Sequence, residues 1–305
     1  MITGIMGLGL LAMSCSSGDT LPEGDTPELL TDMVADQADS DGTASGFEGA
    51  SPVAADMQVI FEDDFTGSSR IPDQDKWVLC ERSTSNWARY LSGSYDQAYQ
   101  QDGILYLKGE LSDGEYLTGG IETRGKFEFQ HGVVECRARF AQMPQGGHTG
   151  IWMMPAPPAL QWPKSGEIDI MEHLNKDDIV YETVHTWYAD DMGHGDDPKA
   201  QQTASVNKAD WNIYGVEWTA DKIIYTVNGV AHLEYPNLHL SGEDGDYQWP
   251  FNHPFYLILS QSLGGEGTWA GAIDDSELPA VFEIDWIRVT QKKTQDSGVP
   301  KVKAD

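Results

Sequence analysis

Residues 166–173 read Gly-Glu-Ile-Asp-Ile-Met-Glu-His and place three carboxylates within six residues of an apolar, β-branched run. Charges crowded on one strand repel each other and lose solvation when they are buried, so packing gives no reason for the pattern. Side chains alternate faces along a strand, which puts Glu167 and Asp169 on one face and Ile168 and Ile170 on the other. The pattern therefore indicates a chemical role.

The third carboxylate, Glu172, falls on the isoleucine face if the alternation is strict. An extra residue at Ile170-Met171, a β-bulge, would return Glu172 to the face of Glu167 and Asp169, and bulges are common beside active sites. Such a groove would suit a retaining glycosidase, in which two carboxyl groups lie roughly 5–5.5 Å apart. Asp169 could then hold a shared proton and separate the pKa values of the two glutamates, which would give an ionised nucleophile and a protonated acid.

Aromatic residues around the motif weigh against the ordinary alternative, in which acidic residues mark the solvated face of a strand. Trp162 precedes the carboxylates, and Trp152, His185 and Trp187 fall on the neighbouring predicted strands. Sugar rings stack on indole faces while their hydroxyl groups bind polar side chains. The combination predicts a sugar-binding cleft.

The run from Trp162 to His173 resembles the signature of glycoside hydrolase family 16, the group of laminarinases, lichenases, agarases and carrageenases. Other segments resemble further strands of that family, in its own order, over about residues 57–291; they include 61–65, 119–127, 132–140, 150–155, 214–218, 254–259 and 285–289. The resemblance implies an all-β, concanavalin-like jelly-roll sandwich of two antiparallel sheets with a concave substrate cleft. The spacing E-x-D-x-x-E is similar to that of the bulged, laminarinase-like branch.

The same resemblance implies roles for individual residues. Glu167 matches the nucleophile, Asp169 the assisting carboxylate and Glu172 the general acid/base of a retaining double displacement. The candidate substrate-binding residues implied by the resemblance are Trp152, Trp162, Trp187 and Trp269 as platforms, His185 beside Glu172, Gln261 as a hydroxyl ligand, and Trp87 and Arg89 in an N-terminal loop. Catalysis would need no cofactor. A structural calcium ion (Ca2+) would be held by Asp285, Glu62 and a backbone carbonyl near Gly103.

Composition and turn residues also favour a mostly β fold. The chain contains 10 Trp, 12 Tyr and 32 Gly, which suits strands joined by many tight turns. Apolar or alternating runs between turn residues predict strands at 58–61, 103–108, 120–129, 132–140, 149–154, 167–172, 180–187, 213–218, 222–227, 230–235, 254–260 and 281–290. Asn228-Gly229 predicts a two-residue hairpin. No long amphipathic helix is predicted.

The N-terminal residues resemble a targeting segment. Residues 1–15 form an apolar run that ends in Leu-Ala-Met-Ser-Cys and resembles a bacterial lipoprotein signal peptide with Cys15 as the acylated residue, although the first basic residue is Arg70. An ordinary hydrophobic N-terminus is the alternative. Residues 16–56 predict a disordered acidic tether, 57–291 the catalytic domain and 292–305 a flexible tail. The protein is therefore expected at the cell surface or in the periplasm, bound to a membrane only through lipid.

Charge and cysteine content restrict the partners. The formal net charge of -30 opposes binding to nucleic acid and to anionic polysaccharides, and favours a neutral glycan. A monomer is expected. With Cys15 assigned to lipid, Cys80 and Cys136 could form a disulfide or remain buried thiols, and the sequence leaves both alternatives open.

Three functions remain open at this point. The first is a retaining endo-β-glycanase that hydrolyses β-1,3 or mixed β-1,3/1,4-glucan. The second is an endo-β-1,4-galactosidase that acts on host O-glycans or a galactan, since segments 79–82 and 117–120 are similar to such relatives. The third is a non-catalytic glycan-binding surface protein, which the presence of both glutamates disfavours.

Overall fold

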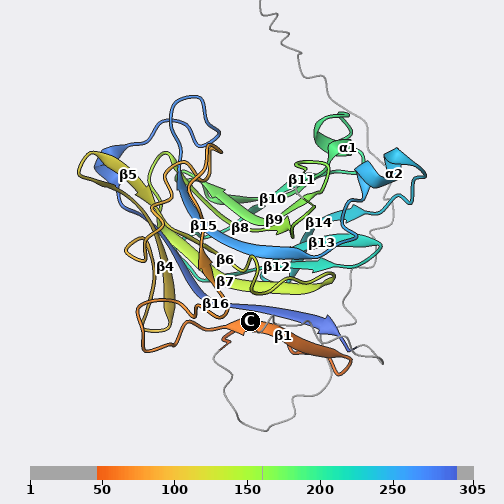
Figure 1. Cartoon of the computed structure of the whole chain (residues 1–305), viewed down its shortest axis with the longest axis horizontal. Helices are drawn as coiled ribbons and strands as arrows, with labels where there is room; N and C mark the ends of the chain where they lie inside the picture. Colours follow the sequence, from red (N-terminus) through yellow and green to blue (C-terminus); the bar gives the residue numbers. More distant parts are fainter. Residues whose placement is uncertain (1–46, 160, 294–305) are drawn as a thin grey trace, which may run out of the picture. The chain divides into compact units, whose positions relative to one another are not determined.

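Two antiparallel sheets face each other and make up nearly all of the domain (Figure 1). This computed structural model describes residues 47–159 and 161–293. All ladders between named strands in these ranges are antiparallel. The predicted all-β sandwich is confirmed.

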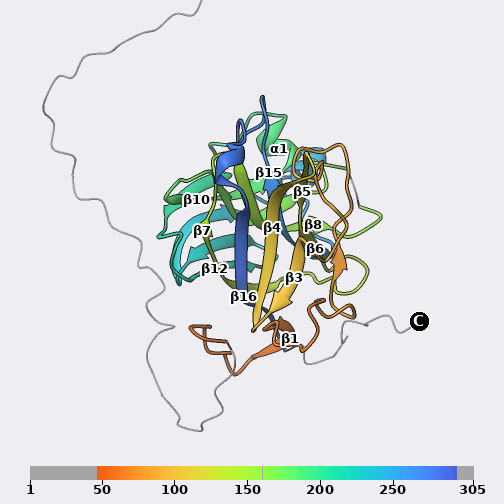
Figure 2. The same ribbon diagram turned by 90° about the vertical axis from the view of Figure 1, so that its left-hand side faces the viewer.

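The nine-stranded sheet has the order β14-β13-β12-β7-β16-β4-β3, with β1 paired to β16 and β5 paired to β4. Figure 2 shows β7, β16, β4 and β3 one after another in this sheet. The strands are β1 (Met57–Asp63), β3 (Ala98–Gln101), β4 (Ile104–Ser112), β5 (Glu115–Thr118), β7 (Gly132–Gln142), β12 (Asn212–Trp218), β13 (Lys222–Val227), β14 (Val230–Pro236) and β16 (Ala280–Lys292).

The seven-stranded sheet has the order β11-β10-β9-β8-β15-β6-β2 and carries the carboxylate motif on β9. Its strands are β2 (Val78–Leu79), β6 (Gly120–Glu122), β8 (Gly147–Pro155), β9 (Glu167–Leu174), β10 (Ile179–His185), β11 (Gln201–Ser205) and β15 (Phe255–Leu263). Two short helices, α1 (Trp187–Asp190) and α2 (Glu243–Gln248), contact each other at one end of this sheet (Figure 1). A 3₁₀ turn spans Asp275–Glu277. Within the described ranges, no helix has the length and apolar character that a membrane crossing requires.

Apolar side chains of both sheets fill the space between them. Ile168, Ile170 and Met171 of β9 are completely buried, as are Val134 and Cys136 of β7 in the opposite sheet. Burial of an aliphatic side chain of this size contributes roughly 1.5–3 kcal/mol. The core therefore fixes which face of β9 can point outward.

Most predicted strands are present, and the errors have local causes. The segment predicted at 120–129 is too long because β6 ends at Glu122, where the Thr123 carbonyl accepts the backbone N–H groups of Lys126 and Phe127 at 2.9 Å each. The strand predicted at 180–187 ends at His185, because Thr186 caps a helix. Four short strands were not predicted, namely β2, β3, β5 and β11.

The Asn228-Gly229 hairpin is confirmed. It joins β13 to β14, and both residues have positive φ values, 50° and 77°. Two consecutive positive φ values are those of a type I′ turn, which matches the twist of the flanking strands.

The predicted tether boundary at residue 56 is too late. Phe47 packs edge-on against Trp286 with ring centroids 5.7 Å apart, and the Trp286 indole donates to the carbonyl of Glu48 at 3.1 Å. Ser51 donates to Glu135, which is also paired with Arg288 at 2.6 Å. Residues 47–56 therefore belong to the folded domain. Cys15, residues 1–46 and residues 294–305 lie outside the described residues.

Both described cysteines are free thiols. Cys80 and Cys136 are buried, Cys80 beside β2 of one sheet and Cys136 on β7 of the other. Burial raises the pKa of both thiols well above the ordinary value. The disulfide alternative is therefore wrong.

One acidic residue faces the core without a described partner. Glu182 lies on β10 between Val180 and Val184, all three are buried, and neither Glu182 carboxyl oxygen has a hydrogen-bond partner among the described residues. Burial raises the pKa of Glu182 to about 8. Glu182 is therefore protonated in the folded protein up to about that pH, whereas an unfolded chain loses this proton near pH 4–5.

This difference predicts that Glu182 makes the domain less stable as the pH rises between about 4.5 and about 8. Glu182→Gln should remove the effect and raise the free energy of unfolding by a few kcal/mol at pH 8, on the order expected for a shift of this size. Urea unfolding at pH 5 and pH 8 measures it. Glu115→Gln, at an exposed position on β5, is the control. Parallel pH slopes for Glu182→Gln and the unmodified chain would contradict the prediction.

Candidate active site

A β-bulge in β9 brings the three carboxylates to one face. On the β8 side, Met171 pairs with Ile151 and Asp169 with Trp152, so Ile170 is the extra residue. On the β10 side, the register shifts at the same place. The predicted bulge is confirmed, and Glu172 rejoins the outer face while the apolar residues of β9 remain in the core.

Gly166 fixes the start of β9 and thereby the position of Glu167. Its φ is +80°, and a Cβ atom here would lie 2.6 Å from the ring of Phe251 and 3.0 Å from Pro250. Only glycine avoids both the strained backbone and the contact. The preceding turn places the indole N–H of Trp162 on Glu167 Oε2, so this exposed tryptophan donates directly to the first carboxylate.

His185 connects the carboxylates of β9 to helix α1. Its Nε2 lies 3.3 Å from Asp169 Oδ2, and its Nδ1 lies 3.1 Å from Asp190 Oδ1. Both contacts suit a doubly protonated ring, because an ionised carboxylate accepts hydrogen bonds. Burial lowers the pKa of His185, but its hydrogen bonds and charge contacts with Asp169 and Asp190, and the charge of Glu167, outweigh it and raise the pKa to about 12. The imidazolium charge therefore offsets part of the acidic cluster.

Burial raises the pKa values of both Glu167 and Asp169. Burial raises the pKa of Glu167 well above its usual value, and the nearby charge of Asp169 raises it further. Burial also raises the pKa of Asp169, against the lowering effect of His185. Because both carboxyl groups are buried and each raises or is raised by its neighbours, Glu167 and Asp169 titrate together and can share a proton.

Glu172 has a different histidine as its partner. His148 of β8 places Nε2 at 2.9 Å from Glu172 Oε1. Sequence analysis expected His185 beside Glu172, and that position is wrong, because His185 pairs across the ladder with Glu167 and Tyr181 is the residue opposite Glu172. The two glutamates thus have separate surroundings.

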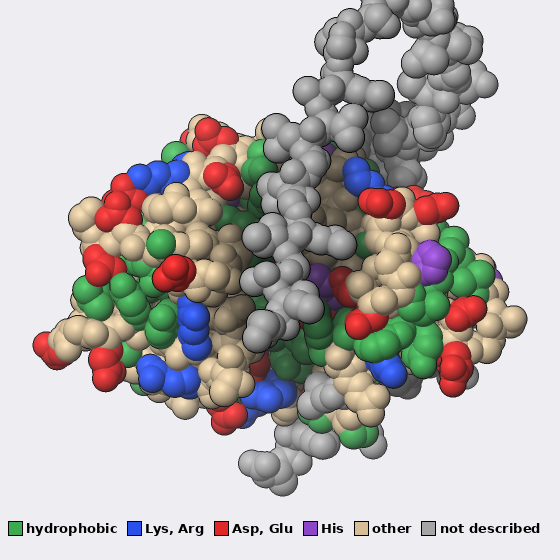
Figure 3. Space-filling model, turned by 90° about the horizontal axis from the view of Figure 1, so that it is seen from above, with side chains coloured by type: hydrophobic (Ala, Val, Ile, Leu, Met, Phe, Trp, Pro, Cys, Tyr) green, Lys and Arg blue, Asp and Glu red, His purple; other side chains and the backbone are tan. Residues whose placement is uncertain are grey.

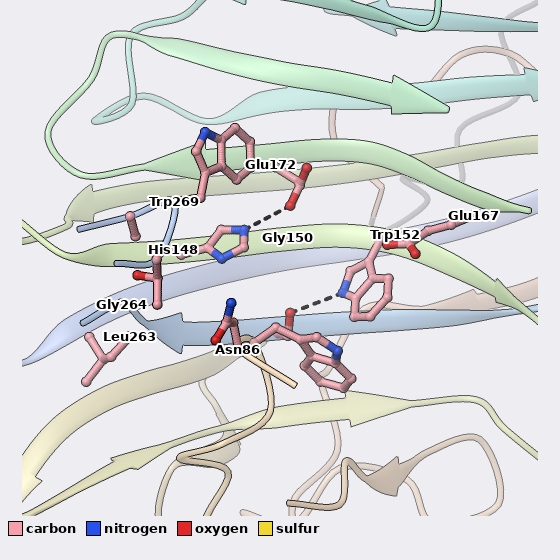
Figure 4. Close-up of a pocket in the computed structure, with 13 residues that line it drawn as sticks. Asn86, His148, Gly150, Trp152, Glu167, Glu172, Leu263, Gly264 and Trp269 are labelled. Atoms are coloured by element: carbon pink, nitrogen blue, oxygen red, sulfur yellow. Dashed lines mark hydrogen bonds and ion pairs between the residues drawn. The ribbon is translucent and has the colours of Figure 1, made fainter. Parts of the chain in front are cut away.

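A cavity of about 230 Å³ opens on this face between the two glutamates and the loops around them (Figure 4). Trp152 lines it beside Glu167, with its indole N–H donating to the Ser260 hydroxyl at 3.1 Å. Trp87 packs edge-on against Trp152, with centroids 4.8 Å apart. Figure 4 shows Trp269 and His148 at the far end, beyond Glu172. The walls combine flat aromatic surfaces with hydroxyl and amide groups, as glycan sites do.

Gln261 does not line this cavity. Ser260 and Ser262 face outward on β15, so alternation turns Gln261 inward, where its amide donates to the carbonyls of His148 at 3.2 Å and Ser262 at 2.8 Å. The side chain is completely buried. The prediction that Gln261 binds a substrate hydroxyl group is therefore wrong, and Ser260 occupies that place.

Trp187 lies beyond the cavity, at the first residue of α1 rather than on a strand. Its ring packs against Tyr247 with centroids 6.1 Å apart, and the Lys164 ammonium lies 4.4 Å from its centroid. Trp162, which donates to Glu167, also contacts His185, with ring centroids 5.7 Å apart. Trp187 could therefore meet only a more distant part of a long substrate.

Arg89 supports the cavity wall from behind. Its guanidinium donates to the carbonyl of Gly264, and a Cβ atom on Gly265 would lie 2.4 Å from it. Arg89 does not line the cavity, so this contact does not support the predicted direct role of Arg89 in substrate binding. Instead, Arg89 ties the N-terminal loop to the 264–270 loop that carries Thr268 and Trp269.

The predicted calcium ligands do not fit a cation site. The carboxylate of Asp285 contacts the guanidinium of Arg137, which already supplies the positive charge, and the Glu62 side chain is exposed on β1. Among the described residues, the one cluster of three metal-type side chains is Glu167, Asp169 and His185. That cluster is the carboxylate site itself.

Sequence reasoning missed four residues with polar side chains that line the cavity, which are His148, Asn86, Ser260 and Thr268. His148 could have been found, because strand alternation puts it on the same face as Gly150 and Trp152. Asn86 and Thr268 come from loops, for which the sequence has no periodic signal.

Residues 85–288 match the profile of Glycosyl hydrolases family 16. The chain belongs to this family. As a family 16 protein it is a glycoside hydrolase, and its relatives support an endo-β-glycanase. The domain is 37% identical to the keratan-sulfate endo-1,4-beta-galactosidase of Sphingobacterium multivorum, over 77% of this chain and 55% of that protein. It thus spans about half the length of that relative.

This chain covers most of the length of two further relatives. The beta-glucanase of Rhodothermus marinus is 31% identical over 77% of this chain and 86% of its own. A solved structure described with endo-acting O-glycanases, which prominent members of the human gut microbiota express to initiate mucin breakdown, is 33% identical. It superposes with a TM-score of 0.68 over 76% of this chain and 98% of its own. The jelly-roll fold of this family 16 domain is thereby shown.

Removing the Arg89 contact should loosen the 264–270 loop without disturbing the carboxylates. For Arg89→Ala we expect KM for a glycan substrate to rise roughly 3–10-fold with a smaller change in kcat, because a charge-assisted hydrogen bond to the loop backbone is lost. Steady-state kinetics with the preferred glycan measures it. Arg70→Ala, at an exposed position that does not line the cavity, is the control. A change confined to kcat would contradict a role in holding the loop.

Proposed function

We propose that this endo-β-glycanase works by retention, with Glu167 as nucleophile, Glu172 as general acid/base and Asp169 as the carboxylate that assists Glu167. The observation that carries this proposal is the bulge at Ile170, which puts the three side chains on one face of β9. The cavity between Glu167 and Glu172 supplies room for a sugar ring against Trp152. Two carboxylates supply both nucleophile and acid, so the reaction needs no cofactor.

In the first step, Glu172 protonates the glycosidic oxygen while Glu167 attacks the anomeric carbon, which forms a glycosyl-enzyme ester and releases the leaving sugar. The proton shared by Glu167 and Asp169 moves to Asp169 as Glu167 attacks. The Trp162 N–H and the His185 charge limit the repulsion between the two carboxyl groups. In the second step, Glu172 takes a proton from water as that water attacks the ester, which restores Glu167.

Substitution of either glutamate tests these roles. Glu167→Ser and Glu172→Gln should each lower kcat by at least about 10³-fold while glycan affinity is kept, because both remove a transition-state function. With a 2,4-dinitrophenyl glycoside, whose leaving group needs no proton, azide should restore turnover, as a β-glycosyl azide, to Glu172→Ala but not to Glu167→Ser. Reducing-sugar release and isothermal titration calorimetry give the two readouts. Full turnover by either primary variant would end the proposed mechanism.

For the substrate, we propose β-1,4-galactosyl bonds inside a host-type glycan. Sequence analysis placed β-glucan first and galactosyl linkages second, and two relatives support reversing that order. These are the keratan-sulfate endo-1,4-beta-galactosidase and the O-glycanase structure, at 37% and 33% identity. Acidic side chains are scattered over the face shown in Figure 3, which favours stretches of the glycan that carry little sulfate.

A β-1,3 or mixed β-1,3/1,4-glucan is the second candidate, supported by the beta-glucanase relative at 31% identity over 86% of its length. The bulged spacing is also that of laminarinase-like relatives. Non-catalytic glycan binding is disfavoured because both glutamates are present and line the cavity.

Product release from a panel of glycans separates the two substrates. We expect oligosaccharides from mucin O-glycans and desulfated keratan, and roughly 10²-fold lower kcat/KM on laminarin and barley glucan, as expected when a site leaves polar groups unpaired on the wrong sugar. Glu172→Gln serves as the blank for contaminating activity. Release of oligosaccharides from the glucans alone would make β-glucan the first candidate again and contradict the proposed galactosyl substrate.

We also propose that the enzyme is a monomer anchored through Cys15 at the cell surface or in the periplasm. The apolar run before Cys15 and the acidic composition that follows support this. Metabolic labelling with palmitate in a bacterial host, with Cys15→Ser as the matched control, tests the anchor, and light scattering tests the monomer.

A further inference from the structure

We propose that His148 is a positioning residue for Glu172, holding one carboxyl oxygen so that the other exchanges the proton of the reaction. This inference rests on the proposed role of Glu172 as acid/base. It concerns a residue that neither the motif nor the expected site residues include.

The first support is the contact itself. His148 Nε2 lies 2.9 Å from Glu172 Oε1 (Figure 4). Gly150 is the residue directly opposite Glu172 on β8, and it has no side chain to fill the space above the pair. A Cβ atom there would lie 3.2 Å from the ring of Trp152. The glycine therefore leaves the carboxylate free to lean along the strand toward His148.

The second support is that the imidazole is held in place. Trp269 packs against His148 with ring centroids 5.7 Å apart and an interplanar angle of 76°. Trp269 also packs against Tyr181, with centroids 4.9 Å apart, and Tyr181 is the neighbour of Glu172 on β10. These contacts restrain the imidazole on the side of Trp269 and favour one direction of Nε2 before substrate arrives.

The third support is the chemistry required of Glu172. An ionised carboxylate only accepts hydrogen bonds, so His148 must donate from Nε2 in that state. A donor on Oε1 stabilises the ionised form, which helps Glu172 release its proton in the first step and remain a base in the second. It also leaves Oε2 as the oxygen that faces the glycosidic bond.

Few other titratable groups face this histidine. From β9, Glu172 contacts the ring and His173 lies on the core side of the strand, stacked on Phe140 with centroids 4.0 Å apart. From β10, Tyr181 reaches it through Trp269, and Ser262 of β15 is its ladder neighbour. Glu172 is thus the one carboxylate in direct contact with His148 among the described residues.

The decisive experiment compares substrates that do and do not need an acid. His148→Ala should lower kcat/KM on the preferred glycan about 10–100-fold, as expected when acid catalysis is impaired. Single-turnover formation of the glycosyl-enzyme from a 2,4-dinitrophenyl glycoside should change less than about threefold, because that leaving group needs no proton. The alkaline limb of the glycan kcat/KM profile should move to higher pH, because ionised Glu172 loses a donor. An equal loss on both substrates, or an unmoved limb, would overturn the proposal.

Conservative variants separate positioning from folding. The side-chain amide of His148→Gln can place an N–H near the position of Nε2 and should recover most of the glycan activity, whereas His148→Asn is too short and should not. This pair decides the question even if His148→Ala fails to fold. His239→Gln, at an exposed site, is the control. If Glu172→Gln loses activity but the His148 variants keep full activity, the role of His148 is rejected and the proposed function stands. If Glu172→Gln keeps full activity, the proposed function itself is rejected.

Discussion

The site depends on one extra residue in one strand. Without the bulge at Ile170, Glu172 would point into the core and Met171 would point into the cleft. The core favours the bulge, because Ile168, Ile170 and Met171 are all buried between the sheets. Without the bulge, the charged side chain of Glu172 would be buried in the core, which is costly. Packing on one face of β9 thus determines the arrangement of charge on the other.

The grouping of charges costs stability, and neighbouring strands offset it in different ways. Asp169 is buried beside Glu167, and the His185 cation, itself paired with Asp190, lies against them from β10. Glu172 has instead a single contact with His148 from β8. Glu167, the proposed nucleophile, therefore has a positive charge beside it, whereas Glu172, the proposed acid/base, has a hydrogen-bond partner. That difference suits a carboxylate that stays covalently engaged and another that gains and loses a proton.

The sequence predicted those features that follow from periodicity and failed where a feature depends on a register or a loop. The spacing from Glu167 to Glu172 was enough to predict the bulge, since only an extra residue reconciles three carboxylates with an apolar face. Gln261 was placed in the cleft because nothing in the run Ser260-Gln261-Ser262 says which alternate face is outward. Trp187 was placed on a strand because the cap at Thr186 was not recognised. Arg89 contacts a loop 175 residues away, which no local pattern could indicate.

His148 shows how alternation can be used more fully once one anchor is known. Trp152 was correctly expected in the cleft, and every second residue of β8 before it must share that face, which includes Gly150 and His148. The three positions form a series along the strand: an aromatic wall beside Glu167, a gap opposite Glu172 and a hydrogen-bond partner beyond it. β8 therefore presents to β9 an aromatic side chain opposite Asp169 and, around Glu172, a gap and a hydrogen-bond partner. The bulge makes this match possible, because it brings Glu172 opposite Gly150 instead of placing a bulky side chain there.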